Sequence, residues 1–224
     1  MKRIALILAM SFVMVTANSQ EFSVVKGVTS GFYFTAGVNG AGLVGWEDPS
    51  NSGAGRIAGF HGGLTFWTKL GKSGRTQLAI EGNFSQQGFS NVEAVDDEDN
   101  EKLVINYFNV PLIVRYRPFP KFWQMYIGAG PQIGFKAGGH VKTVGGEKFE
   151  LNDDALIKNS MSAVGVLGFN FGKFASLGIE FSYQHGLSGF IKDNKELRHS
   201  VYSARMMIPV AVLGAIIEGL GGGY

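Results

Sequence analysis

One stretch, residues 106–118, constrains the fold more than any other because its side chains alternate in character over its whole length. Side chains of a β-strand point to opposite faces in turn, so this pattern predicts a long strand with one apolar and one polar face. Pro111 would break a helix, and in a sheet it removes one backbone donor. The polar set includes Asn109, Arg115 and Arg117. The apolar set is Phe108, Val110, Leu112, Val114 and Tyr116.

The same alternation recurs and marks eight candidate strands. Each is about long enough for the ~9–11 residues that a tilted strand needs to cross a bilayer. The expected bounds are 32–42, 56–68, 75–87, 103–117, 122–135, 160–171, 175–185 and 200–213.

The connections between these strands alternate between short and long. Antiparallel neighbours therefore place all the short turns at one end and all the long loops at the other, as outer-membrane barrels do. The sequence predicts an all-β fold, namely an eight-stranded antiparallel transmembrane β-barrel in a bacterial outer membrane. The short turns are 69–74, 118–121 and 172–174, and the long loops are 43–55, 88–102, 137–159 and 186–199.

Aromatic residues on the apolar faces fall near the two ends of the strands. Such rings are typical of side chains at the level of lipid headgroups. The expected members near the short turns are Phe66, Tyr116, Trp123 and Phe171. Those nearer the long loops are Phe84, Phe108, Phe135, Tyr183 and Tyr202.

Alternation alone leaves open which face points outward. A secreted barrel would bury the apolar face and expose the polar one. The bulky apolar faces would overfill an eight-stranded interior, which favours an apolar outside. The polar faces carry a balanced set of charges, as a closed interior requires, and these are Glu81, Arg115, Glu180 and Arg205.

The N-terminus has the features of a secretory signal peptide. Lys2 and Arg3 precede an apolar run, residues 4–15, and the small residues Ala17 and Ser19 follow it. This order predicts cleavage after Ser19. The whole chain has 20 basic and 18 acidic side chains, and loss of the two N-terminal cations makes the counts equal. A nucleic-acid partner therefore has no electrostatic support.

The chain divides into four expected parts, which are the signal peptide (1–19), a periplasmic lead (20–30), the barrel (31–214) and a C-terminal tail (215–224). The Gly run in the tail makes a poor strand. We therefore expect recognition by the barrel assembly machinery to use residues 202–213. The chain has no Cys, which excludes disulfides and thiolate metal sites.

Three segments resemble a known family. Residues 107–116 are similar to the Y-L-E-I-P-L-L-L-K-Y strand of the PorT-type outer-membrane β-barrel family of Bacteroidetes, and residues 126–131 to its Y-x-x-A-G-P strand. Glu81 with residues 85–88 resembles its E-L-x-Y-S-Q-Q-G strand, and the likeness extends over 31–213. Asn109 stands where the family often has Glu. The resemblance implies a small envelope barrel, and the family's named member belongs to the type IX secretion and gliding apparatus.

The sequence offers little that predicts catalysis. No catalytic, cofactor-binding or metal-binding residue is assigned, and no cofactor is expected. His185 and Ser188 lie near one strand end, without the spacing of a triad. The acidic run 93–101 lacks the pattern of an EF-hand loop and is expected to be a solvated tip. The four histidines, which have no ligand spacing, are His61, His140, His185 and His199.

Glu81, Arg115, Glu180 and Arg205 are expected to meet inside the barrel as paired charges with a structural role. A gate or a proton path is the functional alternative. The predicted function is a non-enzymatic barrel that presents loops outside the cell. The alternatives are an accessory of secretion or gliding and an enzyme acting on lipid A. The expected partners are outer-membrane lipid with lipopolysaccharide, the assembly machinery and, for the secretion alternative, secretion-system proteins.

Overall fold

The computed structural model describes residues 30–44, 55–92, 101–119, 124–142, 148–150, 158–171, 177–189, 198–210 and 212. The expected signal peptide (1–19) and C-terminal tail (215–224) lie outside these residues, as does all of the expected lead except Ser30. Within these ranges no helix is long and apolar enough to cross a membrane. The strands are β1 (Ser30–Val44), β2 (Gly55–Leu70), β3 (Thr76–Val92), β4 (Glu101–Tyr116), β5 (Gln124–Lys142), β6 (Lys148–Glu150), β7 (Asn159–Phe171), β8 (Leu177–Gly186) and β9 (Arg198–Pro209).

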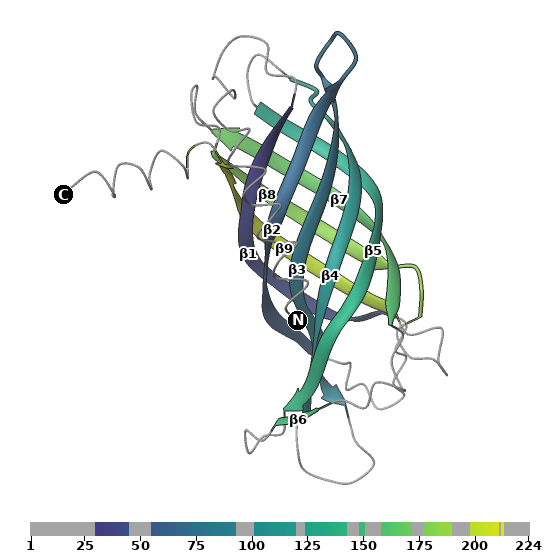
Figure 1. Ribbon diagram of the computed structural model, residues 1–224. Coiled ribbons are helices and arrows are strands. Elements are labelled where there is room, and N and C mark those ends of the chain that lie inside the picture. Colours follow the sequence, from purple (N-terminus) through teal and green to yellow (C-terminus); the bar gives the residue numbers. More distant parts are fainter. Residues whose placement is uncertain are drawn as a thin grey trace, which may run out of the picture.

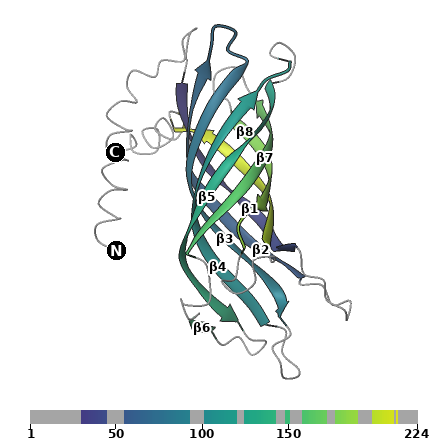
Figure 2. The ribbon, with the colours of Figure 1, turned by 90° about the vertical axis from the view of Figure 1, so that its right-hand side faces the viewer.

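The strands form one closed antiparallel barrel, shown in Figure 1. The order is β4-β3-β2-β1-β9-β8-β7-β5, and pairing of β4 with β5 closes the ring. β6 pairs with the far end of β5, beyond the barrel wall. Figure 2 shows the strong tilt of the strands against the barrel axis. The predicted eight-stranded transmembrane barrel is therefore confirmed.

Several strand bounds differ from the sequence prediction. β3 runs to Val92 and β5 to Lys142, past the expected ends at 87 and 135, so parts of two expected long loops are strand. β6 falls inside the expected long loop 137–159, because three residues are too few to display a period. β9 ends at Pro209 and not at residue 213. Pro209 has no N–H to donate, so it is a natural end to the ladder. At Pro111 the β3–β4 ladder is interrupted between the pairs Ile80–Leu112 and Asn83–Asn109, with no change of register.

The apolar faces of the strands point outward. Leu112 is 43% exposed, whereas Glu180 is fully buried in the barrel. The arrangement of a secreted barrel with an apolar interior is thereby excluded. In bacterial outer-membrane barrels an apolar band of this kind contacts lipid.

The expected aromatic residues lie on the outer wall. Phe66 and Phe84 are partly exposed, and Trp123 lies outside the described residues. The outer wall also carries Phe34, Phe60 and Phe181, which the sequence prediction did not include. The exposed members of the predicted set are Phe108, Tyr116, Phe135, Phe171, Tyr183 and Tyr202.

Two apolar clusters lie inside the barrel, one toward each end. The cluster at the short-turn end is formed by Tyr33, Ala79, Ile113, Tyr126, Val164, Val166 and Met207, with Trp67 packed against it. The cluster at the long-loop end is formed by Phe89, Leu103, Ile105 and Tyr107, with Leu43 and Val141 packed against it. Buried polar side chains line the rest of the interior, and Tyr126 of the first cluster donates a hydrogen bond to one of them, Glu180.

Candidate functional site: a charged network inside the barrel

The four charged residues expected inside the barrel come from four different strands. Glu180 of β8 and Arg205 of β9 are directly opposite each other in the ladder. Glu81 lies on β3 and Arg115 on β4. Each residue occupies a position of its strand that faces the barrel interior, and none is more than 7% exposed.

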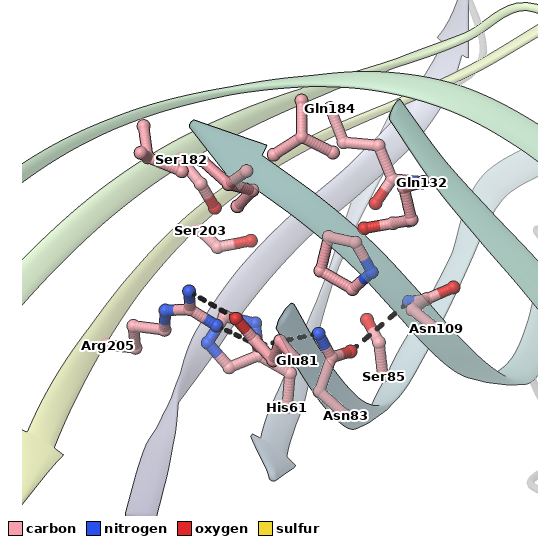
Figure 3. Close-up of a pocket in the computed structure, with 14 residues that line it drawn as sticks. His61, Glu81, Asn83, Ser85, Asn109, Gln132, Ser182, Gln184, Ser203 and Arg205 are labelled. Carbon is pink, nitrogen blue, oxygen red and sulfur yellow. Dashed lines mark hydrogen bonds and ion pairs between the residues drawn. The ribbon is translucent and has the colours of Figure 1, made fainter. Parts of the chain in front are cut away.

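Arg205 lies between two carboxylates, and Figure 3 shows it facing Glu81 across the lumen. Its Nε donates to Glu180 Oε1 at 2.9 Å, and its Nη2 donates to Glu81 Oε2 at 2.7 Å. Further ion-pair contacts join Arg205 to both carboxylates. Strands β1 and β2 separate β3 from β9 in the sheet order. The Arg205–Glu81 pair therefore connects parts of the wall that are not neighbours.

Glu180 also holds a second cation. Arg115 Nη2 donates to Glu180 Oε2 at 2.8 Å, and the Tyr126 hydroxyl donates to the same oxygen at 2.6 Å. The Arg115 guanidinium stands over the Tyr126 ring, 4.8 Å from its centroid. These contacts unite all four predicted residues in one network with two positive and two negative charges.

The charge balance matters because an unpaired charge inside a protein is costly, whereas a hydrogen-bonded pair is tolerated. Glu180 accepts bonds from two arginines and a tyrosine. Glu81 accepts bonds from Arg205 and from Asn83 Nδ2, the latter at 2.7 Å. The network can therefore keep its charges ionised in a narrow lumen, and it connects strands from opposite sides of the barrel.

A small polar cavity of about 20 Å³ borders the network. Its lining includes His61, Asn109 and Gln132, each with a buried polar atom that makes no hydrogen bond to the described residues. A site of this size holds about one water molecule. Asn109, where the resembling family often has Glu, donates from Nδ2 to Asn83 Oδ1 at 3.4 Å. The interior beside the charges is thus lined by neutral polar groups, several of which are labelled in Figure 3.

A second polar group lies nearer the long-loop end. Gln184 Nε2 is 2.7 Å from His199 Nε2 and donates to Ser162 Oγ at 3.1 Å. Ser162 Oγ is itself 3.4 Å from His199 Nε2. The His199 ring stacks on Tyr107, with centroids 6.1 Å apart. The sequence analysis did not single out this group, since its members come from three separate strands.

The other residues singled out in the sequence are not brought together. His185 Nδ1 is 3.3 Å from the Tyr183 hydroxyl, and Ser188 Oγ accepts a bond from the Met161 amide. No hydrogen bond joins His185 to Ser188 in the described part of the chain. Among the same residues there is no group of three or more His, Asp or Glu that could hold a metal ion. All of the acidic run except its last residue, Glu101, lies outside the described ranges.

Replacing Tyr126 with Phe is expected to destabilise the barrel by about 1.5–3 kcal/mol, the usual worth of a hydrogen bond to a charged group. The change removes the 2.6 Å bond to Glu180 and leaves the ring in place. Chemical unfolding in lipid vesicles measures the effect. The matched control is Tyr183→Phe, because that hydroxyl lies on the outer wall and contacts His185. Equal effects of the two substitutions would contradict a special role for Tyr126.

A closed barrel with an apolar outer wall and a paired charge network inside defines an integral membrane β-barrel. The chain belongs to the family described as the outer membrane protein beta-barrel domain, which matches residues 18–192. It is therefore an integral protein of the outer membrane. No curated protein matches the sequence.

Three solved structures are similar to the chain. Ail, the attachment invasion locus protein of Yersinia pestis, solved in complex with the heparin analogue sucrose octasulfate, is 14% identical over 81% of this chain and 99% of its own, with a TM-score of 0.46. Neisserial surface protein A is 15% identical over 80% and 97%, with a TM-score of 0.46. OprG, an outer membrane protein of Pseudomonas aeruginosa, is 12% identical over 81% and 94%, with a TM-score of 0.43. Similarities this low carry no inference about function.

Proposed function

We propose that the protein is a non-conducting, non-enzymatic outer-membrane barrel whose role is structural or interactive and is exerted through its external loops. One observation carries this proposal, namely that ion-paired charges fill the middle of the lumen. Two clusters of apolar side chains fill further parts of the interior. Solute passage would require breaking buried ion pairs, which is costly. An eight-stranded barrel is also just wide enough for side chains to fill it.

The connections on the two rims support a role for the loops. The turn between β2 and β3 spans residues 71–75, whereas β3 and β4 are separated by residues 93–100 and β8 and β9 by residues 187–197. In outer-membrane barrels the longer connections face the outside. The acidic run of the β3–β4 connection places negative charge on that rim, where divalent ions could bridge it to lipopolysaccharide phosphates.

The orientation is tested with single cysteines, since the chain has none of its own. We expect Asp97→Cys, in the β3–β4 connection, to react with a membrane-impermeant maleimide on intact cells. Ser73→Cys, in the exposed β2–β3 turn, is the control and is expected to react only after the outer membrane is permeabilised. The reverse pattern would overturn the assignment of the loops to the cell exterior.

Conductance in a planar lipid bilayer tests the closed lumen. We expect no stepwise current from the purified barrel, because the charge network occupies the lumen. Regular single-channel steps that disappear when the protein is omitted would overturn the proposal of a non-conducting barrel.

An accessory role in protein secretion or gliding is the second candidate, and the likeness of residues 107–116 and 126–131 to PorT-type strands favours it. Such a component should co-purify with other subunits of the machinery. Isolation from mild detergent without any stoichiometric partner would count against this role. A lipid A-modifying activity is the third candidate, and mass spectrometry of lipid A from cells with and without the protein would reveal it.

A further inference from the structure

One basic side chain lies on the outer wall and takes no part in the interior network. Arg56, near the start of β2, is exposed and lies toward the long-loop end of the barrel. Its side chain crosses β1 and reaches β9. Its Nη1 donates to Gly40 O at 3.2 Å, and its Nη2 donates to Ser200 Oγ at 2.8 Å. The guanidinium also stands over the Tyr202 ring, 4.6 Å from the centroid.

One glycine of β1 makes this crossing possible. Gly42 lies at an outward-facing position of β1, beneath the Arg56 side chain. A Cβ on Gly42 would lie 2.9 Å from Arg56 Cγ, so a larger residue would displace the arginine. Ser200, like Tyr202, occupies an outward-facing position of β9. It is nevertheless fully buried, because Arg56 covers it. Arg56 is thus held in place on the wall and does not extend freely into solvent.

The charge of Arg56 has no carboxylate partner among the described residues. Its hydrogen bonds to described residues go to three neutral groups, namely Gly40 O, Ser200 O and Ser200 Oγ. Arg198, two residues before Ser200 on the same face, is also exposed. Arg56 stands over Tyr202, and tyrosines are typical of the headgroup level. This part of the wall therefore suits a phosphate group at the membrane surface.

An apolar groove of about 940 Å³ runs along the wall beside this position. Its outward-facing floor is made of small residues on four strands, Ala58, Gly40, Ala204 and Gly165. Larger side chains, Phe181, Tyr183 and Tyr202, rise beside the floor. Tyr183 and Tyr202 pack with ring centroids 4.8 Å apart. The groove crosses adjacent strands, since β2, β1, β9, β8 and β7 follow one another in the sheet.

We propose that this groove, with Arg56 at its outer end, binds the phosphorylated glycolipid of the outer leaflet, lipid A, with its acyl chains on the small-residue floor and a phosphate against Arg56. The long-loop end faces outward in barrels of this kind, which selects the outer leaflet. A groove that spans several strands accommodates the multiple acyl chains of lipid A better than the two chains of a glycerophospholipid. The site is separate from the interior network, and the choice of the outer leaflet rests on the proposed orientation of the long loops, which the cysteine labelling tests separately.

The test is a titration of the purified full-length barrel in detergent, with bound lipid counted by native mass spectrometry. The probes are diphosphoryl lipid A, dephosphorylated lipid A and phosphatidylglycerol. We expect Arg56→Gln to weaken binding of diphosphoryl lipid A about fivefold, the usual effect of one Arg at an anionic lipid surface. Binding of dephosphorylated lipid A should not change. The matched control is Lys102→Gln, another exposed cation toward the same end of the barrel.

A second variant fills the groove. A Cβ at Gly165 meets no atom within 4 Å, so Gly165→Leu adds bulk without a clash. We expect it to weaken binding of both forms of lipid A, whereas Ile80→Phe, on the outer wall of β3 away from the groove, should weaken neither. A heat-dependent gel shift checks that each variant is folded. If Arg56→Gln fails to fold, the comparison of Gly165→Leu with Ile80→Phe still tests the proposal.

Either of two results would overturn the proposal. The first is equal lipid A binding by Gly165→Leu and Ile80→Phe, or by folded Arg56→Gln and Lys102→Gln. The second is phosphatidylglycerol binding as tightly as diphosphoryl lipid A, which would assign the groove to a glycerophospholipid.

Discussion

Replacing Arg205 with Ala is expected to destabilise the barrel by about 3–5 kcal/mol, the range seen when one partner of a buried ion pair is removed. The substitution leaves two carboxylates, Glu81 and Glu180, facing each other without the cation that joins them. Unfolding by urea in lipid vesicles measures the loss. Arg198→Ala, on the same strand but exposed, is the control and should change the free energy of unfolding by less than about 1 kcal/mol.

A double substitution separates unpaired charge from lost packing. Glu180 still has Arg115 after Arg205 is removed, whereas Arg205 supplies the ion pair of Glu81. Adding Glu81→Gln to Arg205→Ala should therefore restore part of the lost stability. If the double variant is no more stable than Arg205→Ala, or if Arg205→Ala behaves as Arg198→Ala does, the charge network does not stabilise the fold.

The architecture could be predicted from the sequence because its main determinant is local. Alternation over a single strand put Arg115 and Leu112 on opposite faces, and the bulk of the apolar faces then indicated that Leu112 points outward; both positions agree with the structure. The alternating lengths of the connections then indicated the antiparallel order. Neither signal depends on contacts between residues far apart in the chain.

The pairing inside the barrel could not be predicted in the same way. The alternation of side chains along each strand puts Glu81 and Arg205 in the lumen. Their contact, however, depends on the tilt of the strands and on the closing of the barrel by pairing of β1 with β9. Tyr126 alternates with the polar residues of its strand, and this position indicates that its side chain faces the interior. A tyrosine near a strand end could, however, equally have been one of the aromatic residues at the level of the lipid headgroups. The position of Arg56 on the wall could not be predicted, because the Gly-rich strand around it alternates poorly and because its partners are on β1 and β9.

Replacing Leu112 with Arg is the second large expected effect. Leu112 occupies an outward-facing position of β4. An arginine on that face near the middle of the bilayer destabilises a barrel by about 2–4 kcal/mol. The same side chain nearer the interface costs only about 0–1 kcal/mol. We therefore expect Leu112→Arg to lower the free energy of unfolding in lipid vesicles far more than Asn106→Arg, on the same strand and face but toward the long-loop end.

The comparison tests the lipid contact of this wall separately from the interior pairs. If the wall faced water, arginine at position 112 would be no more costly than arginine at position 106, because both would be solvated. In a bilayer the two costs must differ, since solvation of the guanidinium falls with depth while the strand and its hydrogen bonds stay the same. Equal unfolding free energies for Leu112→Arg and Asn106→Arg would contradict the burial of Leu112 in hydrocarbon, and with it the orientation of every strand that shares this alternation.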